Sequence, residues 1–141
     1  MRDLDMSLRF YRDGLGLDLL LDRRVEGDWP ELLGAPSRSL RAVFLGDERF
    51  PDDHSGVLEL NLFDGDLDAT PTQPAPTAGF FLLSFFVDVE ATLARLAALE
   101  LGGSPRRVSR TGPSGPMPLA TVRDPDGVLV LLVPGSITQN V

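Results

Sequence analysis

A repeated plan constrains the fold of this 141-residue chain more than any other feature of its sequence. Asp3 and Asp88 each precede a run of apolar residues at helical spacing, and an aspartate in this position can accept a hydrogen bond from the first free amides of a helix. Ser7 and Thr92 occupy matching places in the two runs. Each run ends near a Leu-Gly pair and is followed by three strand-like segments. The chain is therefore predicted to form two similar modules of one α+β plan.

The first module is predicted to cover residues 1–63. A polar turn with Asp28, Trp29 and Pro30 follows its first strand, and a loop with His54 separates its second strand from its third. No strand-like segment precedes the helix, so either this module lacks an opening strand or another segment supplies it. The predicted elements are a helix over residues 4–13 and strands over residues 17–24, 39–45 and 57–63.

The second module is predicted to cover residues 79–134, after a linker over residues 64–78 and before a tail over residues 135–141. Several prolines in the linker exclude both a helix and an inner strand. Asp88 caps the predicted helix, and the Asp-Pro-Asp-Gly sequence that starts at Asp124 favours a tight turn before the last strand. The predicted strands span residues 80–87, 106–110, 119–123 and 128–133.

Charge and composition exclude several classes of protein. The net charge is −8, opposite to the charge that a nucleic-acid backbone selects. The absence of Cys excludes disulfides and Cys-ligated metals, and the absence of Lys excludes Schiff-base chemistry. No apolar stretch reaches the roughly 20 residues of a membrane span, and the first residues lack a signal-peptide core. The sequence thus predicts a cytoplasmic protein that binds neither nucleic acid nor membranes.

Three segments resemble the vicinal oxygen chelate superfamily, which includes glyoxalases, bleomycin resistance proteins and extradiol dioxygenases. They are residues 3–17, residues 87–90 at the start of the second helix, and the turn at residues 124–127. The resemblance implies an α+β fold in which two βαβββ modules form a curled mixed sheet that closes a cup around a small molecule. By this plan, the first strand of the first module is missing from the sequence.

The resemblance also implies where metal ligands would lie, because each module of the metal-dependent members offers one ligand from its first strand and one from its last. Glu59 keeps the carboxylate of the first module, whereas the other position of that module would precede Met1. The usual histidine of the second module falls on Leu82, or on Phe81 in a register shifted by one residue, and the usual glutamate falls on Leu131. Aliphatic and phenyl side chains cannot coordinate a metal, so no cofactor is expected.

The candidate ligand-binding residues come from both modules. Alternation along residues 80–87 is expected to turn one face of that strand toward the cup, although the same face could instead form core or a dimer interface. Glu59 is the candidate catalytic residue; alternatively its face of the strand is open to solvent, or Arg41 or Arg123 pairs with it. The predicted set is Glu59, Asn61, Leu82, Ser84, Phe86, Leu131 and Trp29.

These observations favour a homodimer that binds a small, partly apolar or cationic molecule without a metal. The alternative is a divalent-metal lyase, epimerase or dioxygenase of the same superfamily, which would need ligands from other positions. His54 is the only histidine, and its loop is either a general-base site or a solvated turn. Acidic loop residues such as Asp47 and Asp64 either attract a cation or keep the protein soluble. The arginines at positions 106, 107 and 110 either hold a carboxylate or protect an edge strand.

Overall fold

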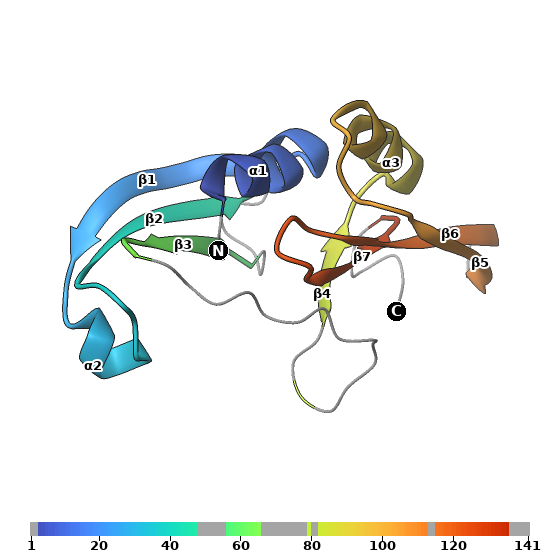
Figure 1. Ribbon diagram of the computed structural model, residues 1–141. Coiled ribbons are helices and arrows are strands. Elements are labelled where there is room, and N and C mark those ends of the chain that lie inside the picture. The colour runs from blue at the N-terminus through green and yellow to red at the C-terminus, as the bar shows by residue number, and fades with distance from the viewer. Residues whose placement is uncertain (1–2, 48–55, 66–78, 80–81, 113–114, 136–141) are drawn as a thin grey trace. The chain divides into compact units, whose positions relative to one another are not determined.

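A computed structural model describes residues 3–47, 56–65, 79, 82–112 and 115–135. The chain divides into two compact units, residues 1–69 and residues 70–141. Each unit combines a helical segment with one β-sheet, so the predicted α+β class is confirmed (Figure 1). The loop around His54 and most of the predicted linker lie outside the described residues.

The first unit begins with the predicted helix. Asp3 caps it, because its Oδ1 accepts a hydrogen bond of 2.9 Å from the amide of Met6. The helical segment starts as α1 (Leu4–Leu8) and continues as a π-helical turn, η1 (Arg9–Gly14). In this wider turn the amide of Leu15 donates to the carbonyl of Phe10, five residues earlier, at 3.0 Å. The sequence predicted the extent of this helix but not its wider second half.

The sheet of the first unit has three antiparallel strands in the order β1 (Asp18–Glu26), β2 (Ser39–Gly46) and β3 (Leu58–Phe63). All three strands were predicted, within two residues at each end. The register of β1 shifts at Leu20, which forms a bulge. A Cβ atom at Gly46 would lie 2.7 Å from Cδ1 of Leu20, so a larger residue there would require the exposed Leu20 side chain to shift.

A short helix, α2 (Trp29–Leu33), occupies the connection between β1 and β2, where a polar turn was predicted. That prediction is wrong. Pro30 lies in the first turn of the helix, where a missing amide costs nothing and a fixed φ favours helical backbone. Gly34 then ends the helix with a φ of 67°, a left-handed conformation that glycine adopts without strain.

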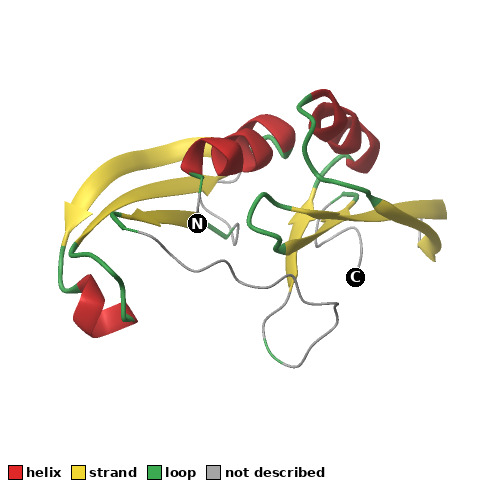
Figure 2. Ribbon diagram, viewed as in Figure 1, coloured by secondary structure: helices red, strands yellow, loops and turns green. Residues whose placement is uncertain are grey.

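The second unit has a four-stranded sheet in the order β4-β7-β6-β5 (Figure 2). β4 runs parallel to β7, and the other neighbours are antiparallel. All of its predicted strands and its helix are confirmed, and the predicted turn between β6 and β7 is closed by Asp124, whose Oδ1 accepts hydrogen bonds from the amides of Asp126 and Val128. The elements are β4 (Leu82–Phe86), α3 (Val89–Ala98), β5 (Arg106–Gly112), β6 (Gly115–Arg123) and β7 (Leu129–Val133).

Each sheet packs one of its faces against the helix of its unit. In the second unit a Cβ atom at Gly102 would lie 3.5 Å from both Leu96 of α3 and Val122 of β6, so these two side chains meet there. In the first unit the hydrogen bond to Asp22 raises the pKa of Arg41 of β2, and the charge of Asp5 in α1 adds to this shift, which agrees with a helix on the sheet face that carries Arg41. The apolar residues of that face, Val43, Leu45 and Leu60, are at most 5% exposed.

No helix in the described part of the chain is long and apolar enough to span a membrane.

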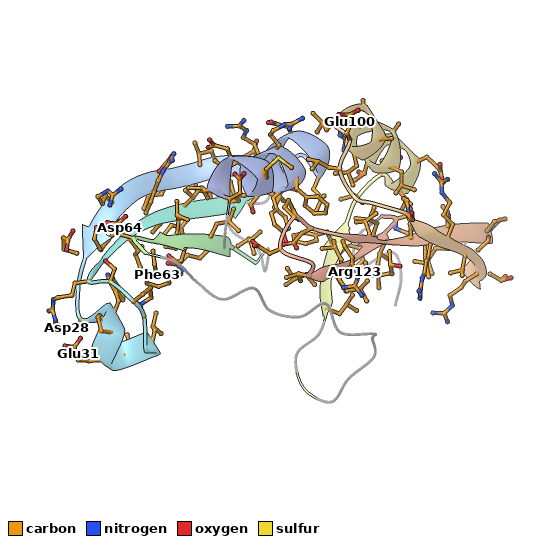
Figure 3. All side chains as sticks on the ribbon, viewed as in Figure 1. Asp28, Glu31, Phe63, Asp64, Glu100 and Arg123 are labelled. Atoms are coloured by element: carbon orange, nitrogen blue, oxygen red, sulfur yellow. The ribbon has the colours of Figure 1, made fainter. Side chains whose placement is uncertain are left out.

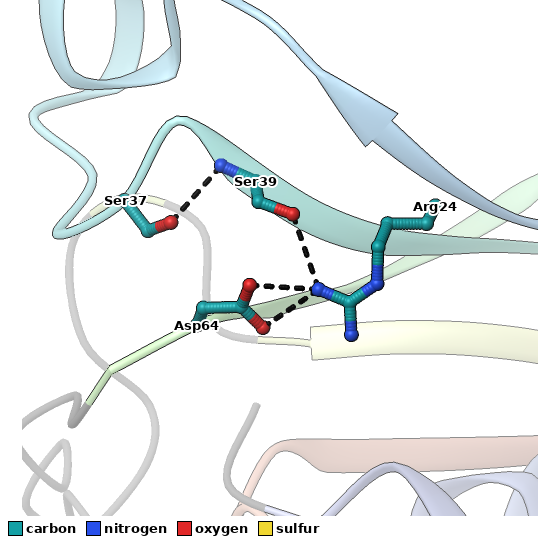
Figure 4. Close-up of polar contacts among 4 residues, drawn as sticks. All are labelled: Arg24, Ser37, Ser39 and Asp64. Carbon is teal, nitrogen blue, oxygen red and sulfur yellow. Dashed lines mark hydrogen bonds and ion pairs between the residues drawn. The ribbon is translucent and has the colours of Figure 1, made fainter.

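Two ion pairs join the strands of the first unit. Arg24 and Arg41 lie directly opposite each other on β1 and β2, an arrangement that repels unless each charge is compensated. Arg41 donates hydrogen bonds to the carboxylate of Asp22 at 2.6 and 2.8 Å. Arg24 donates to Asp64 at 2.7 Å and to Ser39 at 3.1 Å, and so connects β1 to the residue after β3 (Figure 4). Hydrogen bonds from these arginines lower the pKa of Asp22 and of Asp64.

The cap of α3 is the first target for a stability test. The side chain of Asp88 accepts a hydrogen bond of 2.9 Å from the amide of Ala91. We expect Asp88→Ala to lower the free energy of unfolding by about 1 kcal/mol, because the amide loses its partner. Asp88→Asn keeps an acceptor oxygen and should lose much less in the same urea titration. Equal losses in the two variants would show that the cap hydrogen bond does not stabilise the helix.

The ion pair of Asp22 predicts a dependence of stability on pH. Because the folded pKa of Asp22 lies below its unfolded value, the pair stabilises the protein above about pH 4, and this stabilisation disappears as the pH falls through the folded pKa. Asp22→Asn should therefore lower the free energy of unfolding at pH 7 by about 0.2–1 kcal/mol. In thermal melts the difference should shrink as the pH falls below about 4.

A matched control is Glu26→Gln, which removes a carboxylate at the exposed end of the same strand. No ion pair involves Glu26 among the side chains that the structure describes. Its melting temperature should follow that of the unmodified protein at every pH. A constant difference between Asp22→Asn and the unmodified protein from pH 7 to pH 2 would contradict the assignment.

Candidate functional site

All candidate residues except Trp29 lie on strands, on the sheet faces that point away from α1 and α3. In the first unit this distal face is opposite the face that carries Arg41, Val43 and Leu45, because strand side chains alternate. The three strands are in register, so each of residues 40–45 of β2 has one direct neighbour on β1 and one on β3, and these three side chains share a face. The first distal face is defined by Leu21, Arg23, Val25, Leu40, Ala42, Phe44, Glu59, Asn61 and Phe63.

Glu59 and Asn61 of β3 lie together on the first distal face. Glu59 pairs in register with Phe44, and Asn61 pairs with Ala42. Glu59 is exposed. Of the alternatives for this residue, the one in which its face of the strand is open to solvent is therefore correct. Arg41 does not pair with it, because Arg41 lies on the opposite face and binds Asp22.

The second unit has a corresponding distal face. Val130 and Leu132 of β7 are fully buried on the side of α3, so Leu131 between them points the other way. Ser84 of β4 lies next to Leu131 in register, with Leu82 and Phe86 on either side of it along the same face. The structure thus brings together four of the predicted residues. The second distal face is defined by Leu82, Ser84, Phe86, Arg106, Val108, Leu119, Thr121, Arg123, Leu129, Leu131 and Val133.

This second distal face is apolar at its centre and polar at its margins. Phe86 is 40% exposed, Ser84 is exposed, and Leu131 is half-buried. The half-buried Arg123 lies at the end of β6, and its guanidinium donates a hydrogen bond of 2.6 Å to the carbonyl of Gly127 (Figure 3). That bond holds the arginine over the turn that joins β6 to β7.

Sequence reasoning missed three residues of these faces as site candidates. Phe44 lies beside Glu59, Thr121 lies beside Leu131, and Arg123 lies beside Leu129. Alternation within the predicted strands 39–45 and 119–123 could have assigned these side chains to faces. Alternation does not show which strands pair with each other, so it could not have shown which of these side chains are neighbours.

Trp29 lies at the other end of the first sheet from Glu59. It belongs to α2, which follows the end of β1, whereas Glu59 is near the start of β3. Its indole nitrogen is buried and has no hydrogen-bond partner among the described residues. Together with Asp28, Glu31 and Leu32 it lines an open hollow of about 340 Å³. The structure therefore does not bring Trp29 next to Glu59.

The hollow beside Trp29 carries two carboxylates that already have a partner. Arg38 forms ion pairs with Asp28 and, at 3.1 Å, with Glu31. Binding of a cationic ligand there would have to displace this guanidinium. The hollow is thus a weaker candidate site than the two distal faces.

The described residues do not fit a divalent metal. Glu59 supplies one carboxylate, but Leu82 and Leu131 have no donor atom, and a metal site needs three or more ligands. Within the described ranges no three His, Cys, Asp or Glu side chains are grouped closely enough to hold a metal ion. His54 lies outside those ranges. No catalytic step is therefore assigned to a metal.

Comparison with known proteins agrees with this architecture. The family model of the Glyoxalase/Bleomycin resistance protein/Dioxygenase superfamily matches residues 1–132. The lactoylglutathione lyase-like protein terB of Aspergillus terreus is 41% identical over 136 residues, which cover 92% of this chain and 68% of that protein.

Two crystal structures show the same fold. One is a glyoxalase family protein from Bacillus cereus, with a TM-score of 0.66 and 22% identity over 95% of this chain and 87% of that chain. The other is a glyoxylase/bleomycin resistance protein/dioxygenase domain from Frankia sp. EAN1pec, with a TM-score of 0.61 and 20% identity over 97% of this chain and 87% of that chain. The family match and the shared fold agree with the motifs in both modules, and the chain belongs to the glyoxalase/bleomycin resistance protein/dioxygenase superfamily.

Proposed function

We propose that this protein binds a small, partly apolar or cationic organic molecule on the distal faces of its sheets, without a divalent metal. The observation that carries the proposal is the chemistry at Leu82 and Leu131. Both residues lie on the second distal face, where metal-dependent relatives would place ligands, and both offer only aliphatic surface. A ligand there gains affinity from the removal of apolar surface from water, by about 25 cal/mol for each Å² buried.

The second distal face suits a planar, partly apolar molecule. The exposed ring of Phe86 can stack on an aromatic ligand, and the leucines around Ser84 form the floor of the face. The hydroxyl groups of Ser84 and Thr121 can orient polar atoms of such a ligand by hydrogen bonds. Sites of this kind, mostly apolar with a few polar groups, are typical of small-molecule binding.

The first distal face suits a positive charge. The exposed carboxylate of Glu59 lies beside the ring of Phe44, and both groups attract a cation. Residues 1–69 contain 16 acidic and 8 basic side chains, whereas residues 70–141 contain five of each. The whole net charge of −8 therefore belongs to the first unit, which raises the local concentration of cationic ligands.

A second candidate function is metal-dependent chemistry by a lyase, an epimerase or a dioxygenase. It is favoured by the 41% identity to a protein that is named as lactoylglutathione lyase-like. This function would require metal ligands other than Leu82 and Leu131. Assembly as a homodimer and a cytoplasmic location remain predictions, and sedimentation analysis together with cell fractionation tests them.

A thermal-shift screen tests the metal-free proposal. Aromatic metabolites and cationic antibiotics are added to the protein with a chelator, and in parallel with zinc, nickel or manganese. A true ligand at 100 times its Kd should stabilise the protein by about 2.7 kcal/mol. The shift should be equal with and without chelator, and Phe86→Ala should abolish it. Leu33→Ala is the matched control, because Leu33 is 59% exposed in α2 and lies outside both distal faces.

Either of two results of this screen would refute the proposal. One is a shift that requires an added metal and disappears with chelator. The other is a set of ligand shifts that Phe86→Ala and Leu33→Ala leave equally intact. In the second case the ligand binds away from the second distal face.

Introducing the metal-ligand residues of the family should not produce enzyme activity. We expect the double variant Leu82→His and Leu131→Glu to have no hemithioacetal isomerase activity. Both side chains are half-buried, and a buried polar group without a partner costs about 1–3 kcal/mol. The in-register neighbours of Leu131 offer only the hydroxyl groups of Ser84 and Thr121, and no carboxylate or amide, to orient a metal ligand there. A folded double variant that binds nickel tightly and isomerises a hemithioacetal would favour the enzyme function instead.

A further inference from the structure

The arginines of β5 do not all lie on the same face of the second sheet. Arg107 pairs in register with Ala120, which is buried on the side of α3, and its guanidinium forms an ion pair of 2.8 Å with Glu90 of that helix. Because side chains alternate along a strand, the preceding residue, Arg106, lies on the second distal face. Protection of the β5 edge against pairing would not require an arginine on this particular face.

Arg106 begins a row of side chains that crosses the whole second sheet. Thr121 of β6 is its neighbour in register, Leu131 of β7 follows, and Ser84 of β4 ends the row. Neighbouring strands lie about 4.8 Å apart, so the row is about 14 Å long. The row is positive at Arg106 and apolar at its centre. This length and this chemistry fit one small molecule that is charged at one end.

A second arginine lies close to the positive end of this row. Arg123 is two residues beyond Thr121 on β6 and is therefore on the same face. Diagonal neighbours on paired strands are about 7–8 Å apart, so Arg106 and Arg123 flank Thr121. The hydrogen bond of 2.6 Å from Arg123 to the carbonyl of Gly127 holds this guanidinium in place without removing its charge (Figure 3). Two like charges repel each other, and an anion bound beside Thr121 would stabilise both.

The second distal face has no negative charge of its own, because none of the residues that define it is acidic. The described residues include no ion-pair partner for Arg106. A guanidinium matches a carboxylate in geometry, since it can donate two parallel hydrogen bonds to the two oxygens. One negative charge on the ligand is favoured over several, because the whole chain has a net charge of −8. The positive end of the row thus suits a single carboxylate.

We propose that the second distal face binds an organic anion, whose carboxylate lies beside Arg106 and Arg123 and whose planar apolar body covers Leu131. The carboxylate accepts hydrogen bonds from the guanidinium of Arg106 and from the hydroxyl of Thr121. This inference rests on the proposed function, and it adds the charge and the orientation of the ligand. The first distal face carries the carboxylate of Glu59 instead, so the two faces prefer ligands of opposite charge.

Two naphthalene compounds that share one planar body test this inference. 2-Naphthoate carries a carboxylate, and 2-naphthamide is its neutral amide. Their Kd values for the 141-residue protein are measured by isothermal titration calorimetry at pH 7 and low salt. We expect 2-naphthoate to bind about fivefold more tightly than the amide, although the net charge of the chain by itself would favour the amide. The ratio of the two Kd values should fall towards one at high salt.

Three single variants locate the carboxylate. Arg106→Gln should bring the ratio to about one and change the Kd of 2-naphthamide by less than about twofold. Arg107→Gln and Arg110→Gln are matched controls, because each removes one positive charge from the same strand. Arg107 lies on the α3 side, and Arg110 lies opposite Met117, beyond the part of β6 that pairs with β7. Both controls should keep the preference for 2-naphthoate.

Three results would overturn the inference. Equal Kd values for the two compounds in the unmodified protein would show that the face does not select an anion, and the proposed function would still stand if Phe86→Ala weakened the binding of both. A ratio that Arg106→Gln leaves unchanged, or that all three arginine variants reduce equally, would show that Arg106 does not hold the carboxylate. Binding of neither compound at about 5 mM would refute both the inference and the planar ligand proposed for this face.

Discussion

Each sheet buries one of its faces under the helix of its unit. Because side chains alternate along a strand, the residues between the buried ones lie on the opposite face. Val130 and Leu132 are fully buried against α3, and Leu131 is therefore forced onto the second distal face. The same rule places Glu59 opposite the buried Leu60. The position of each candidate residue thus follows from core packing. A substitution on a distal face can change binding chemistry without removing the contacts that hold the helix.

The two distal faces have different chemistry although the units share one plan. The first face carries an exposed carboxylate in a unit of net charge −8, and the second presents leucine and phenylalanine side chains in a unit of net charge zero. Leucine occupies the two positions where the family resemblance would place metal ligands, so the binding that we propose would depend on apolar contact and electrostatic attraction. Neither requires coordination. Affinity should therefore respond to the size of the apolar ligand surface and to salt.

The sequence predicted the elements whose signal is local. The caps at Asp3 and Asp88, the alternation through residues 82–86 and the Asp-Gly turn each depend on neighbouring residues, and the structure confirms them. α2 was missed because Asp, Trp and Pro are typical of turns, while its stop at Gly34 comes only five residues later. The π-helical turn was missed because one wider turn leaves the apolar spacing almost unchanged. Trp29 was wrongly grouped with Glu59 because strand pairing, which separates them, has no local signal.

The metal content of the purified protein tests the central claim most directly. The protein is expressed in medium with zinc, nickel, manganese and iron, purified without chelator, dialysed, and measured by elemental mass spectrometry beside the Glu59→Gln variant. We expect far less than one metal ion per chain in both proteins, because Leu82 and Leu131 cannot supply donor atoms. One tightly bound metal ion per chain that is lost in Glu59→Gln would contradict the account and make metal-dependent chemistry the leading function.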